Sequence, residues 1–272
     1  VENAVNNARK IAEMGTREIV LTGVNLGDFG NGTEVIEGTK PKKEAMFIDL
    51  IHELDKVEGI NRFRISSIEP NLCTQEVIDF VATSERFVPH FHIPLQSGCN
   101  KVLKMMRRRY QRELYAERVA WIKEKMPHAC IGVDVIVGFP GESEEDFLET
   151  YHFLNDLDIS YLHVFTYSER PNTPAAEMPD QVSVEERRRR NEMLTILSEK
   201  KKRHFYNQHL GETRPVLFEQ SKTEGKMNGF TENYIRVELD LLEELLNTIA
   251  PVQLNSINSD GLMEVELAPN LV

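Results

Sequence analysis

Five short apolar runs, rich in β-branched residues, recur between residues 18 and 167 and alternate with helix-length amphipathic segments. The runs are Glu18–Asn25, Arg62–Ile68, His90–Leu95, Ile131–Gly138 and Tyr161–Tyr167. Few charges interrupt them, which is typical of strands that are buried on both faces of a parallel sheet. Strands and helices that alternate in this way indicate right-handed βαβ units. The sequence therefore predicts an α/β fold, either a barrel or an open sheet.

The segments between the runs have helical periodicity. From Glu44 to Val57 apolar residues recur at i, i+3, i+4 and i+7 and form one stripe. Thr74–Val81 and Ser143–Leu157 show the same pattern, and Ser143 with Asp146 resembles an acidic capping box. Val1–Met14 also has a helical pattern, with no strand before it. A barrel that is cut just after its first strand would begin in this way, so we expect a truncated barrel.

The pattern changes after Pro179. Val184–His209 is predicted to be one long charged helix. From Thr213 onward, short alternating runs broken by glycines indicate a small all-β module. These runs are Pro215–Phe218, Tyr234–Leu239, Pro251–Leu254 and Met263–Leu267. We therefore expect an α/β domain over residues 1–210 and an all-β domain over residues 211–272.

Composition excludes several classes of protein. With 40% hydrophobic residues in 272 and no apolar run near 18 residues, the chain offers no membrane span. Val1–Gly15 lacks the apolar core of a signal peptide. The cysteines Cys73, Cys99 and Cys130 are too few and too scattered for a disulfide framework or a close-spaced metal cluster, so we expect a cytoplasmic protein. The missing initiator Met suggests a fragment.

Charge is distributed unevenly along a chain whose net charge is −12. The segment Lys101–Met126 holds nine basic and three acidic residues, whereas Pro215–Val272 holds three basic and ten acidic residues. Screening confines each field to roughly 8–10 Å, so the basic stripe can bind phosphate although the whole chain is acidic. A solvated helix face explains the stripe equally well.

The carboxyl ends of the expected strands are the places where an α/β barrel carries its reactive groups. Here they hold glycines, prolines and neutral polar residues, with no motif of a hydrolase or a phosphate-binding loop. His90 and His92 alternate on one strand, but a histidine pair without a third ligand is more often structural than metal-binding. Asp134 interrupts an apolar strand, where it belongs either to a core network or to a site.

Longer motifs carry a specific resemblance. HIPLQSGCNKVLKMMRRRY, DVIVGFPGESEEDFLET and HVFTYSERPNTPAAEM resemble the methylthiotransferase branch of the radical SAM superfamily, and LTGVNLGDFG and NGFTENYIRVEL agree with it. RFRISSIEP, PHFHIPLQSG, MRRRY and LHVFTYS look most like the MtaB type, whose members add a methylthio group to threonylcarbamoyl-adenosine beside the tRNA anticodon. The sibling types act on isopentenyl-adenosine in tRNA (MiaB) or on an aspartate of a ribosomal protein (RimO).

This resemblance implies a partial (β/α)₆ radical SAM barrel, here without its first strand, followed by a TRAM-like RNA-binding β-barrel. It implies S-adenosylmethionine as cofactor, two [4Fe–4S] clusters, an electron donor that reduces them, and tRNA as partner, with no membrane. The family holds its clusters with two sets of three cysteines, and neither set is present in this sequence. We expect the fragment itself to be inactive, so no catalytic residue and no metal ligand is assigned.

By the same resemblance, the strand ends imply contacts to S-adenosylmethionine. Gly23 and Asn25 match the strand end that binds the methionine amine, Gln96 and Ser97 match the ribose contact, and Arg108 is suited to the carboxylate. The positions that match the adenine contacts, or that face the same mouth, are Val137, Gly138, Phe165, Tyr167, Ser67 and Glu69.

For RNA we expect stacking and a basic track. The candidates are Arg107, Arg108, Arg109 and Tyr110, and in the β module Phe230, Asn233, Tyr234 and Arg236. The net negative charge of that module argues against extensive phosphate contacts. Two alternatives stay open: a module that binds S-adenosylmethionine or RNA without chemistry, and an unrelated α/β-barrel enzyme.

Overall fold

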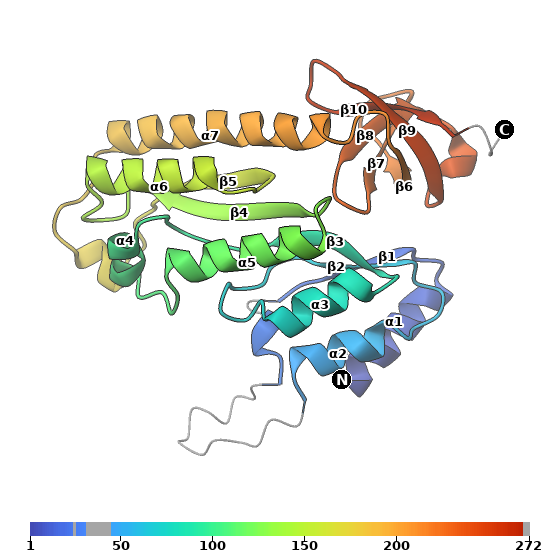
Figure 1. Cartoon of the computed structure of the whole chain (residues 1–272), viewed down its shortest axis with the longest axis horizontal. Helices are drawn as coiled ribbons and strands as arrows, with labels where there is room; N and C mark the ends of the chain where they lie inside the picture. The colour runs from blue at the N-terminus through green and yellow to red at the C-terminus, as the bar shows by residue number, and fades with distance from the viewer. Residues whose placement is uncertain (24–25, 31–44, 269–272) are drawn as a thin grey trace. The chain divides into compact units, whose positions relative to one another are not determined.

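The computed structural model describes residues 1–23, 26–30 and 45–268. These residues form two compact units. The first unit comprises Val1–Ser66, Asp79–His90 and Arg203–Val272, and the second comprises Ser67–Ile78 and Phe91–Lys202. Figure 1 labels the helices and strands of both units.

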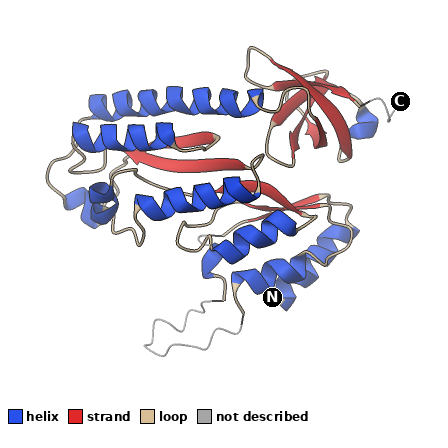
Figure 2. Cartoon of the chain, viewed as in Figure 1, coloured by secondary structure: helices blue, strands red, loops and turns tan. Residues whose placement is uncertain are grey.

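Helices and strands alternate along residues 1–207, as Figure 2 shows by colour. The helices are α1 (Glu2–Glu13), α2 (Phe47–Leu54), α3 (Gln75–Thr83), α4 (Asn100–Met105), α5 (Arg112–Lys125), α6 (Glu144–Asp156) and α7 (Val184–Asn207), with short 3₁₀ turns η1 (Leu26–Asp28) and η3 (Pro174–Glu177). The strands of this region are β1 (Glu18–Leu21), β2 (Arg62–Ile65), β3 (Phe87–His92), β4 (Cys130–Val137) and β5 (Tyr161–Thr166). None of the helices in the described part of the chain has the length and hydropathy needed to cross a bilayer.

The five strands form one sheet in the order β1-β2-β3-β4-β5, and β1–β2 and β4–β5 pair in parallel. The predicted α/β sheet is therefore confirmed. Four strands begin within one residue of the predicted positions. The exception is β3, which begins at Phe87 and runs through Pro89, the residue that we placed before the strand. The fixed φ of proline is compatible with extended backbone, so it does not end a strand by itself.

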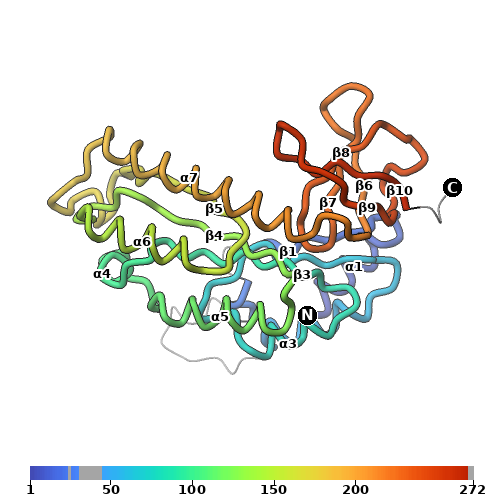
Figure 3. The backbone as a smooth tube through the Cα atoms, turned by 45° about the horizontal axis from the view of Figure 1, so that its top comes forward, coloured from blue at the N-terminus to red at the C-terminus, as the bar shows by residue number. Residues whose placement is uncertain are grey.

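Local chemistry explains where α6 begins. Ser143 caps the helix: its Oγ accepts a hydrogen bond from the backbone N–H of Asp146 (3.2 Å), and an Asp146 carboxylate oxygen accepts one from the N–H of Ser143 (2.9 Å). This reciprocal pair is the predicted capping box. Within the second unit α6 and α7 lie side by side in both Figure 1 and Figure 3. The Arg189 guanidinium of α7 binds the Glu144 carboxylate of α6 at 2.6 Å.

The C-terminal strands close into a barrel with the order β10-β8-β7-β6-β9 (orange to red in Figure 3). They are β6 (Thr213–Gln220), β7 (Lys226–Thr231), β8 (Arg236–Asp240), β9 (Ile249–Ile257) and β10 (Met263–Leu267), with a 3₁₀ turn η4 (Glu243–Leu245). The predicted all-β module is confirmed, but the sequence pattern did not indicate β7. Gly229 interrupts the alternation of that strand because a Cβ at this position would lie 2.5 Å from the backbone oxygen of Leu217 on β6.

In the first unit two buried arginines of β2 bind the barrel. Arg62 donates from Nη1 to the carbonyl oxygen of Phe230 (3.0 Å) and from Nη2 to that of Pro215 (2.7 Å). Arg64 donates from Nε to the Glu18 carboxylate of β1 (2.8 Å). Burial lowers the pKa of Arg62, although the nearby Glu18 carboxylate opposes the shift. These charge-assisted bonds connect β2 to backbone carbonyls of the barrel strands.

Candidate cofactor pocket

A pocket of about 1000 Å³ lies in the second unit at the carboxyl ends of β4 and β5 and beside the end of α4. Its lining residues are Met105, Met106, Arg107, Arg108, Ile136, Phe139, Phe165, Thr166, Tyr167, Ser168, Arg170, Thr173, Pro174, Ala175 and Met178. This is the edge of the sheet where the sequence pattern placed the reactive groups. The wall is mostly apolar and aromatic with a few convergent polar groups, which is typical of a small-molecule site.

Two polar groups of this pocket are buried without a hydrogen-bond partner among the described residues. They are the Nε of Arg108 and the hydroxyl of Tyr167. The Nη1 of Arg108 lies 3.8 Å from a carboxylate oxygen of Glu69, too far for a hydrogen bond. A buried polar group without a partner is costly, and such groups commonly bind a ligand or an ordered water. The pocket wall therefore contains a guanidinium and a phenol, each with a polar atom that has no partner among the described residues.

Gln96 and Gly138, at the same edge of the sheet, both have positive φ angles. Gln96 has a φ of +74°, in the left-handed region that residues with a Cβ rarely adopt. Its N–H donates to the Asp134 carbonyl (2.8 Å), and its carbonyl accepts from the Ile136 N–H (2.9 Å). Gly138 also has a φ of +74°, and its N–H donates to the Glu142 carboxylate (2.8 Å). Strain of this kind at a non-glycine residue is concentrated at functional sites.

Ser97 and Val137 are buried away from the pocket. The Ser97 hydroxyl lies 3.1 Å from the Thr150 hydroxyl and accepts from the N–H of Cys99 (3.2 Å). The pocket wall contains Ile136 instead of Val137, because successive side chains of a strand point to opposite faces. Period-2 alternation along β4 is the signal that would have selected Ile136.

The structure adds residues that the sequence motifs did not single out. They are the methionines Met105, Met106 and Met178 and the ring of Phe139, which contacts the ring of Tyr167 at 5.5 Å between centroids. These methionines lie at helix ends and in loops, where apolar residues do not recur at a regular spacing, so no sequence pattern identifies them. Phe165 and Tyr167, in contrast, were predicted and both line the pocket, with Phe165 52% exposed.

The remaining cofactor candidates lie apart from the lining. Ser67 is half-buried, and Glu69 approaches the pocket only through Arg108. Gly23 follows β1 in the first unit, where an added Cβ would lie 3.2 Å from the Leu26 side chain. Asn25 lies outside the described residues.

The arginines of the basic segment after α4 differ in their exposure to solvent. Arg107 and Arg109 are exposed, whereas Arg108 is half-buried in the pocket wall. Tyr110 is 6% exposed and donates its hydroxyl to the carbonyl oxygen of Leu95 (3.0 Å). Its burial also raises its pKa. The Tyr110 side chain is therefore bonded to the loop after β3 and is not available for stacking on a base. The exposed guanidinium groups of Arg107 and Arg109 are the parts of this segment that a phosphate can reach.

The aromatic candidates of the barrel form a stack inside the first unit. The ring of Tyr234 lies nearly parallel to that of His90 (4.0 Å between centroids, 10°) and to that of Phe230 (4.7 Å, 15°). The Arg64 guanidinium lies 5.0 Å from the Tyr234 ring centroid. The Tyr234 ring is thus packed against two protein rings and a guanidinium, and it is half-buried.

The two polar candidates of the barrel differ in exposure. Asn233 is fully buried, and its side-chain oxygen accepts from the Thr231 hydroxyl (2.6 Å). Arg236 is exposed, and its backbone N–H donates to the hydroxyl of Tyr206 (3.0 Å). Of the four barrel candidates, Arg236 is the exposed cation.

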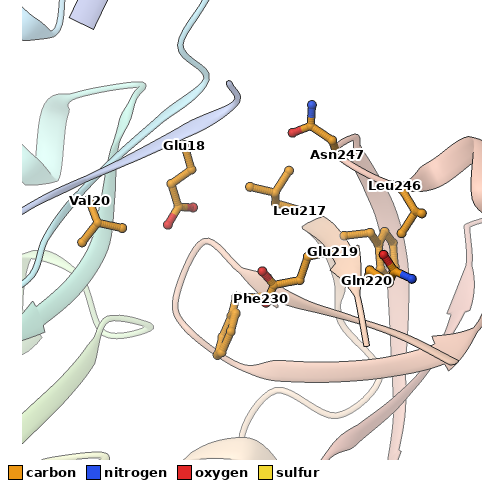
Figure 4. A pocket seen from close by; sticks show the side chains of 9 residues that line it. Glu18, Val20, Leu217, Glu219, Gln220, Phe230, Leu246 and Asn247 are labelled. Carbon is orange, nitrogen blue, oxygen red and sulfur yellow. The ribbon is translucent and has the colours of Figure 1, made fainter. Parts of the chain in front are cut away.

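A second cavity, of about 490 Å³, lies in the first unit (Figure 4). Glu18, Glu219, Phe230, Leu246 and Asn247 are among its lining residues, and those residues include no lysine or arginine. The Glu18 carboxylate is already bound by Arg64. With two carboxylates and mainly apolar walls, this cavity is unsuited to a phosphate.

A protein-family model for the radical SAM superfamily matches residues 1–154, which is more than half of the chain. The chain belongs to the radical SAM superfamily. The resemblance that the motifs indicated is therefore confirmed at the level of the superfamily. The expectation that the chain comes from a radical SAM enzyme is confirmed with it.

Relatives of this radical SAM chain extend the match beyond residue 154. It is 39% identical over 258 residues to threonylcarbamoyladenosine tRNA methylthiotransferase MtaB of Bacillus subtilis, with 93% of this chain and 55% of the relative covered. It is 38% identical over 246 residues to MtaB of Aquifex aeolicus (90% and 56% covered). It is 34% identical over 224 residues to tRNA-2-methylthio-N(6)-dimethylallyladenosine synthase of Pelotomaculum thermopropionicum (82% and 48% covered). The chain thus spans about half the length of the curated relatives it matches.

Membership of the superfamily implies S-adenosylmethionine and a [4Fe–4S] cluster as cofactors. The pocket fits the first of these: Arg108 offers donors suited to a carboxylate, and Phe139, Phe165 and Tyr167 offer aromatic surface for a base. The pocket volume of about 1000 Å³ and the unpartnered atoms of Arg108 and Tyr167 also agree with a ligand as large and as polar as S-adenosylmethionine.

The cysteines of this chain do not fit an iron–sulfur cluster. Cys73, Cys99 and Cys130 are all buried free thiols; Cys73 precedes α3, Cys99 precedes α4 and Cys130 begins β4. Burial raises the pKa of Cys73 to about 12 and that of Cys99 to about 11. Cluster ligands are thiolates gathered around one cluster, whereas burial favours the protonated form of Cys73 and Cys99 and the three cysteines lie far apart along the chain. We therefore assign none of the three cysteines to a cluster.

Proposed function

We propose that this chain is the S-adenosylmethionine-binding part of a tRNA methylthiotransferase that adds a methylthio group to threonylcarbamoyl-adenosine next to the anticodon. The observation that carries the proposal is the identity of 38–39% to two MtaB enzymes over 90% or more of the chain. The dimethylallyladenosine synthases match at 30–36% identity, so the dimethylallyl-adenosine activity is the second candidate.

In this proposal the pocket at the ends of β4 and β5 holds S-adenosylmethionine. Arg108 binds the carboxylate of the methionine part, because its Nε has no other partner among the described residues. Phe165 and Tyr167 contact the adenine, and Gly138 keeps the backbone of the β4 end in the left-handed turn beside it. When bound, S-adenosylmethionine would supply the methyl group and the precursor of the radical, an external donor would supply the electron, and the sulfur atom would come from a separate sulfur donor.

The tRNA is proposed to contact the exposed cations beside the same pocket. Arg107 and Arg109 flank Arg108 and are open to solvent, so they can bind phosphates of the nucleotide that enters the pocket. The closed barrel over β6 to β10 is proposed to be a TRAM-like module that adds a restricted RNA contact through Arg236. Domain boundaries at residues 1–210 and 211–272 are part of this proposal.

Mass spectrometry of total tRNA nucleosides tests the function. We expect deletion of the gene that encodes this chain to abolish only the methylthio form of threonylcarbamoyl-adenosine. Loss of the methylthio form of dimethylallyl-adenosine would establish the second candidate instead. An unchanged set of methylthiolated nucleosides would refute both tRNA activities and direct the search to a ribosomal-protein aspartate.

The proposed cofactor contact is tested in the same strain by complementation. The gene with Arg108→Lys should restore little of the modified nucleoside, because an ammonium cannot reproduce the bidentate guanidinium contact. The matched control is Arg9→Lys, an exposed arginine of α1 in the first unit. Full restoration by both variants would remove Arg108 from the site.

A further inference from the structure

Three polar side chains meet on adjacent strands of the second unit, outside the lining of the cofactor pocket. They are His92 at the end of β3, Asp134 in β4 and His163 in β5. One nitrogen of each histidine and one carboxylate oxygen all lie within 4.8 Å of one another. The sequence pattern paired His92 only with His90 and offered no third ligand; the sheet provides two further ligands for His92.

The register of β4 and β5 explains why these groups converge. Asp134 pairs with His163, and the neighbouring pairs on the same face are Gly132 with Tyr161 and Ile136 with Phe165. Residues two apart on a strand share a face, so these pairs form three successive layers. His92 joins the middle layer: its Nε2 lies 2.8 Å from Asp134 Oδ1.

The layers on either side enclose the cluster. Gly132 leaves space for the Tyr161 ring, since an added Cβ would lie 2.2 Å from a ring atom. That ring contacts His163 edge-on at 5.1 Å between centroids. On the other side Ile136 and Phe165 belong to the pocket wall. The cluster therefore lies one layer beneath the pocket, on the same face of the sheet.

The strand backbone holds the three ligand-bearing positions rigidly. Asp134 is paired with β5, and its carbonyl accepts hydrogen bonds from the N–H groups of Leu95 (3.1 Å) and Gln96 (2.8 Å). The rings of His92 and His163 meet at 80° with centroids 5.6 Å apart, so they converge and do not stack. Sites that are built on strands keep their geometry better than sites on loops.

We propose that His92, Asp134 and His163 form a binding site for a divalent transition-metal ion, with Zn²⁺ as its preferred occupant. Two imidazoles and one carboxylate are a ligand set of zinc and non-haem iron sites, whereas Mg²⁺ and Ca²⁺ prefer oxygen ligands alone. Ligand atoms bound to tetrahedral Zn²⁺ at about 2.0–2.2 Å lie roughly 3.3–3.6 Å apart. The 2.8 Å separation between His92 Nε2 and Asp134 Oδ1 would lengthen to that value, and the separations of up to 4.8 Å in the cluster would shorten to it, through small side-chain rotations.

The ion would keep open coordination positions. His163 is exposed, and His92 and Asp134 are 17% and 22% exposed, so water or a substrate group can reach the ion. Three protein ligands with an open position are the arrangement of catalytic and ligand-binding zinc sites, and structural sites have four. This inference does not depend on the proposed tRNA activity.

Titration of the metal-free protein with Co²⁺, which has visible d–d absorption, tests the site. We expect one equivalent to bind, to be displaced by Zn²⁺, and to bind more than about a hundredfold more weakly in His163→Asn and Asp134→Asn, since loss of an outer-shell partner alone costs 10–100-fold. The control is His152→Asn, an exposed histidine of α6. His163→Cys should keep the ion and add a thiolate-to-cobalt charge-transfer band.

A second measurement needs no variant. Paramagnetic Co²⁺ should shift the imidazole NMR resonances of two histidines at one equivalent, and those of His152 should stay in place. Equal Co²⁺ affinity in the wild type and in folded His163→Asn would overturn the proposal. So would the absence of saturable binding to wild-type protein with native circular dichroism.

Discussion

Arg190 of α7 and Glu142 form an ion pair that is almost wholly removed from solvent. Nη1 lies 2.7 Å from Oε1, and the two side chains are 5% and 1% exposed. The same carboxylate oxygen accepts the N–H of Gly138 at 2.8 Å, so it holds the left-handed turn at the end of β4. Removing one charge should therefore affect both the stability of the second unit and the pocket edge.

The expected magnitudes follow from which partners remain. Arg190→Met leaves the Glu142 carboxylate with the neutral Gly138 N–H and without its cation, and an uncompensated buried charge of this kind costs about 3–5 kcal/mol. Glu142→Gln keeps an acceptor for Gly138 and leaves Arg190 bound to Glu186 (2.9 Å), so we expect a cost of about 1–3 kcal/mol. The double variant should cost less than the sum, because no buried carboxylate remains in it.

The pH dependence has a definite sign. Burial raises the pKa of Glu142 above its usual value of 4.5, although the Gly138 N–H and Arg190 both oppose the shift. A carboxyl whose pKa is higher in the folded state loses stabilising free energy as the pH rises through that pKa. Arg190→Met removes an opposing cation, so its destabilisation should grow from pH 4.5 upward. Glu142→Gln should remove this part of the pH dependence.

Urea denaturation followed by circular dichroism, at several pH values, measures these differences. The matched control is Lys202→Met on the same helix, which breaks the exposed pair with Glu199 (3.0 Å) and should cost under about 1 kcal/mol. A cost of Arg190→Met no larger than that of Lys202→Met, or one that does not change between pH 4.5 and 8, would refute this account of the buried pair.

Three further results are expected. Arg108→Ala should weaken S-adenosylmethionine binding about ten- to a hundredfold, which is the 1.5–3 kcal/mol of a hydrogen bond to a charged group, and isothermal titration measures it. Arg107→Ala with Arg109→Ala should reduce tRNA affinity and lower the slope of log affinity against log salt by about 2, measured by filter binding. Cys73 and Cys99, with pKa values of about 12 and 11, should react with a thiol reagent only after unfolding.

Each of these results has a contrary outcome. If Arg108→Ala binds S-adenosylmethionine with unchanged heat and affinity, Arg108 does not bind the carboxylate of its methionine part. Arg9→Ala is the control for the loss of a surface charge. An unaltered salt slope would show that the basic segment is a solvated face. Rapid labelling of the folded chain at neutral pH would contradict the burial of the two thiols.

The sequence alone determined the parts of this protein that depend on local pattern. The alternation of apolar runs and amphipathic segments predicted the α/β sheet, and Ser143 with Asp146 predicted the start of α6. Contiguous motifs predicted the superfamily, because they are read along the chain. Phe165, Tyr167 and Arg108 were predicted cofactor contacts and all three line the pocket, since strand ends and the following helix lie at that edge in any α/β fold of this kind.

Only the tertiary structure decided which side chains meet. Ser97 and Tyr110 look available in the sequence, yet neighbouring elements bury both and use their hydroxyls. His92 acquires Asp134 and His163 as neighbours because strand register, which is set by long-range pairing, brings positions 42 and 71 residues away onto one face. Periodicity shows which face of an element is buried, but the partner across that face is selected by packing between elements.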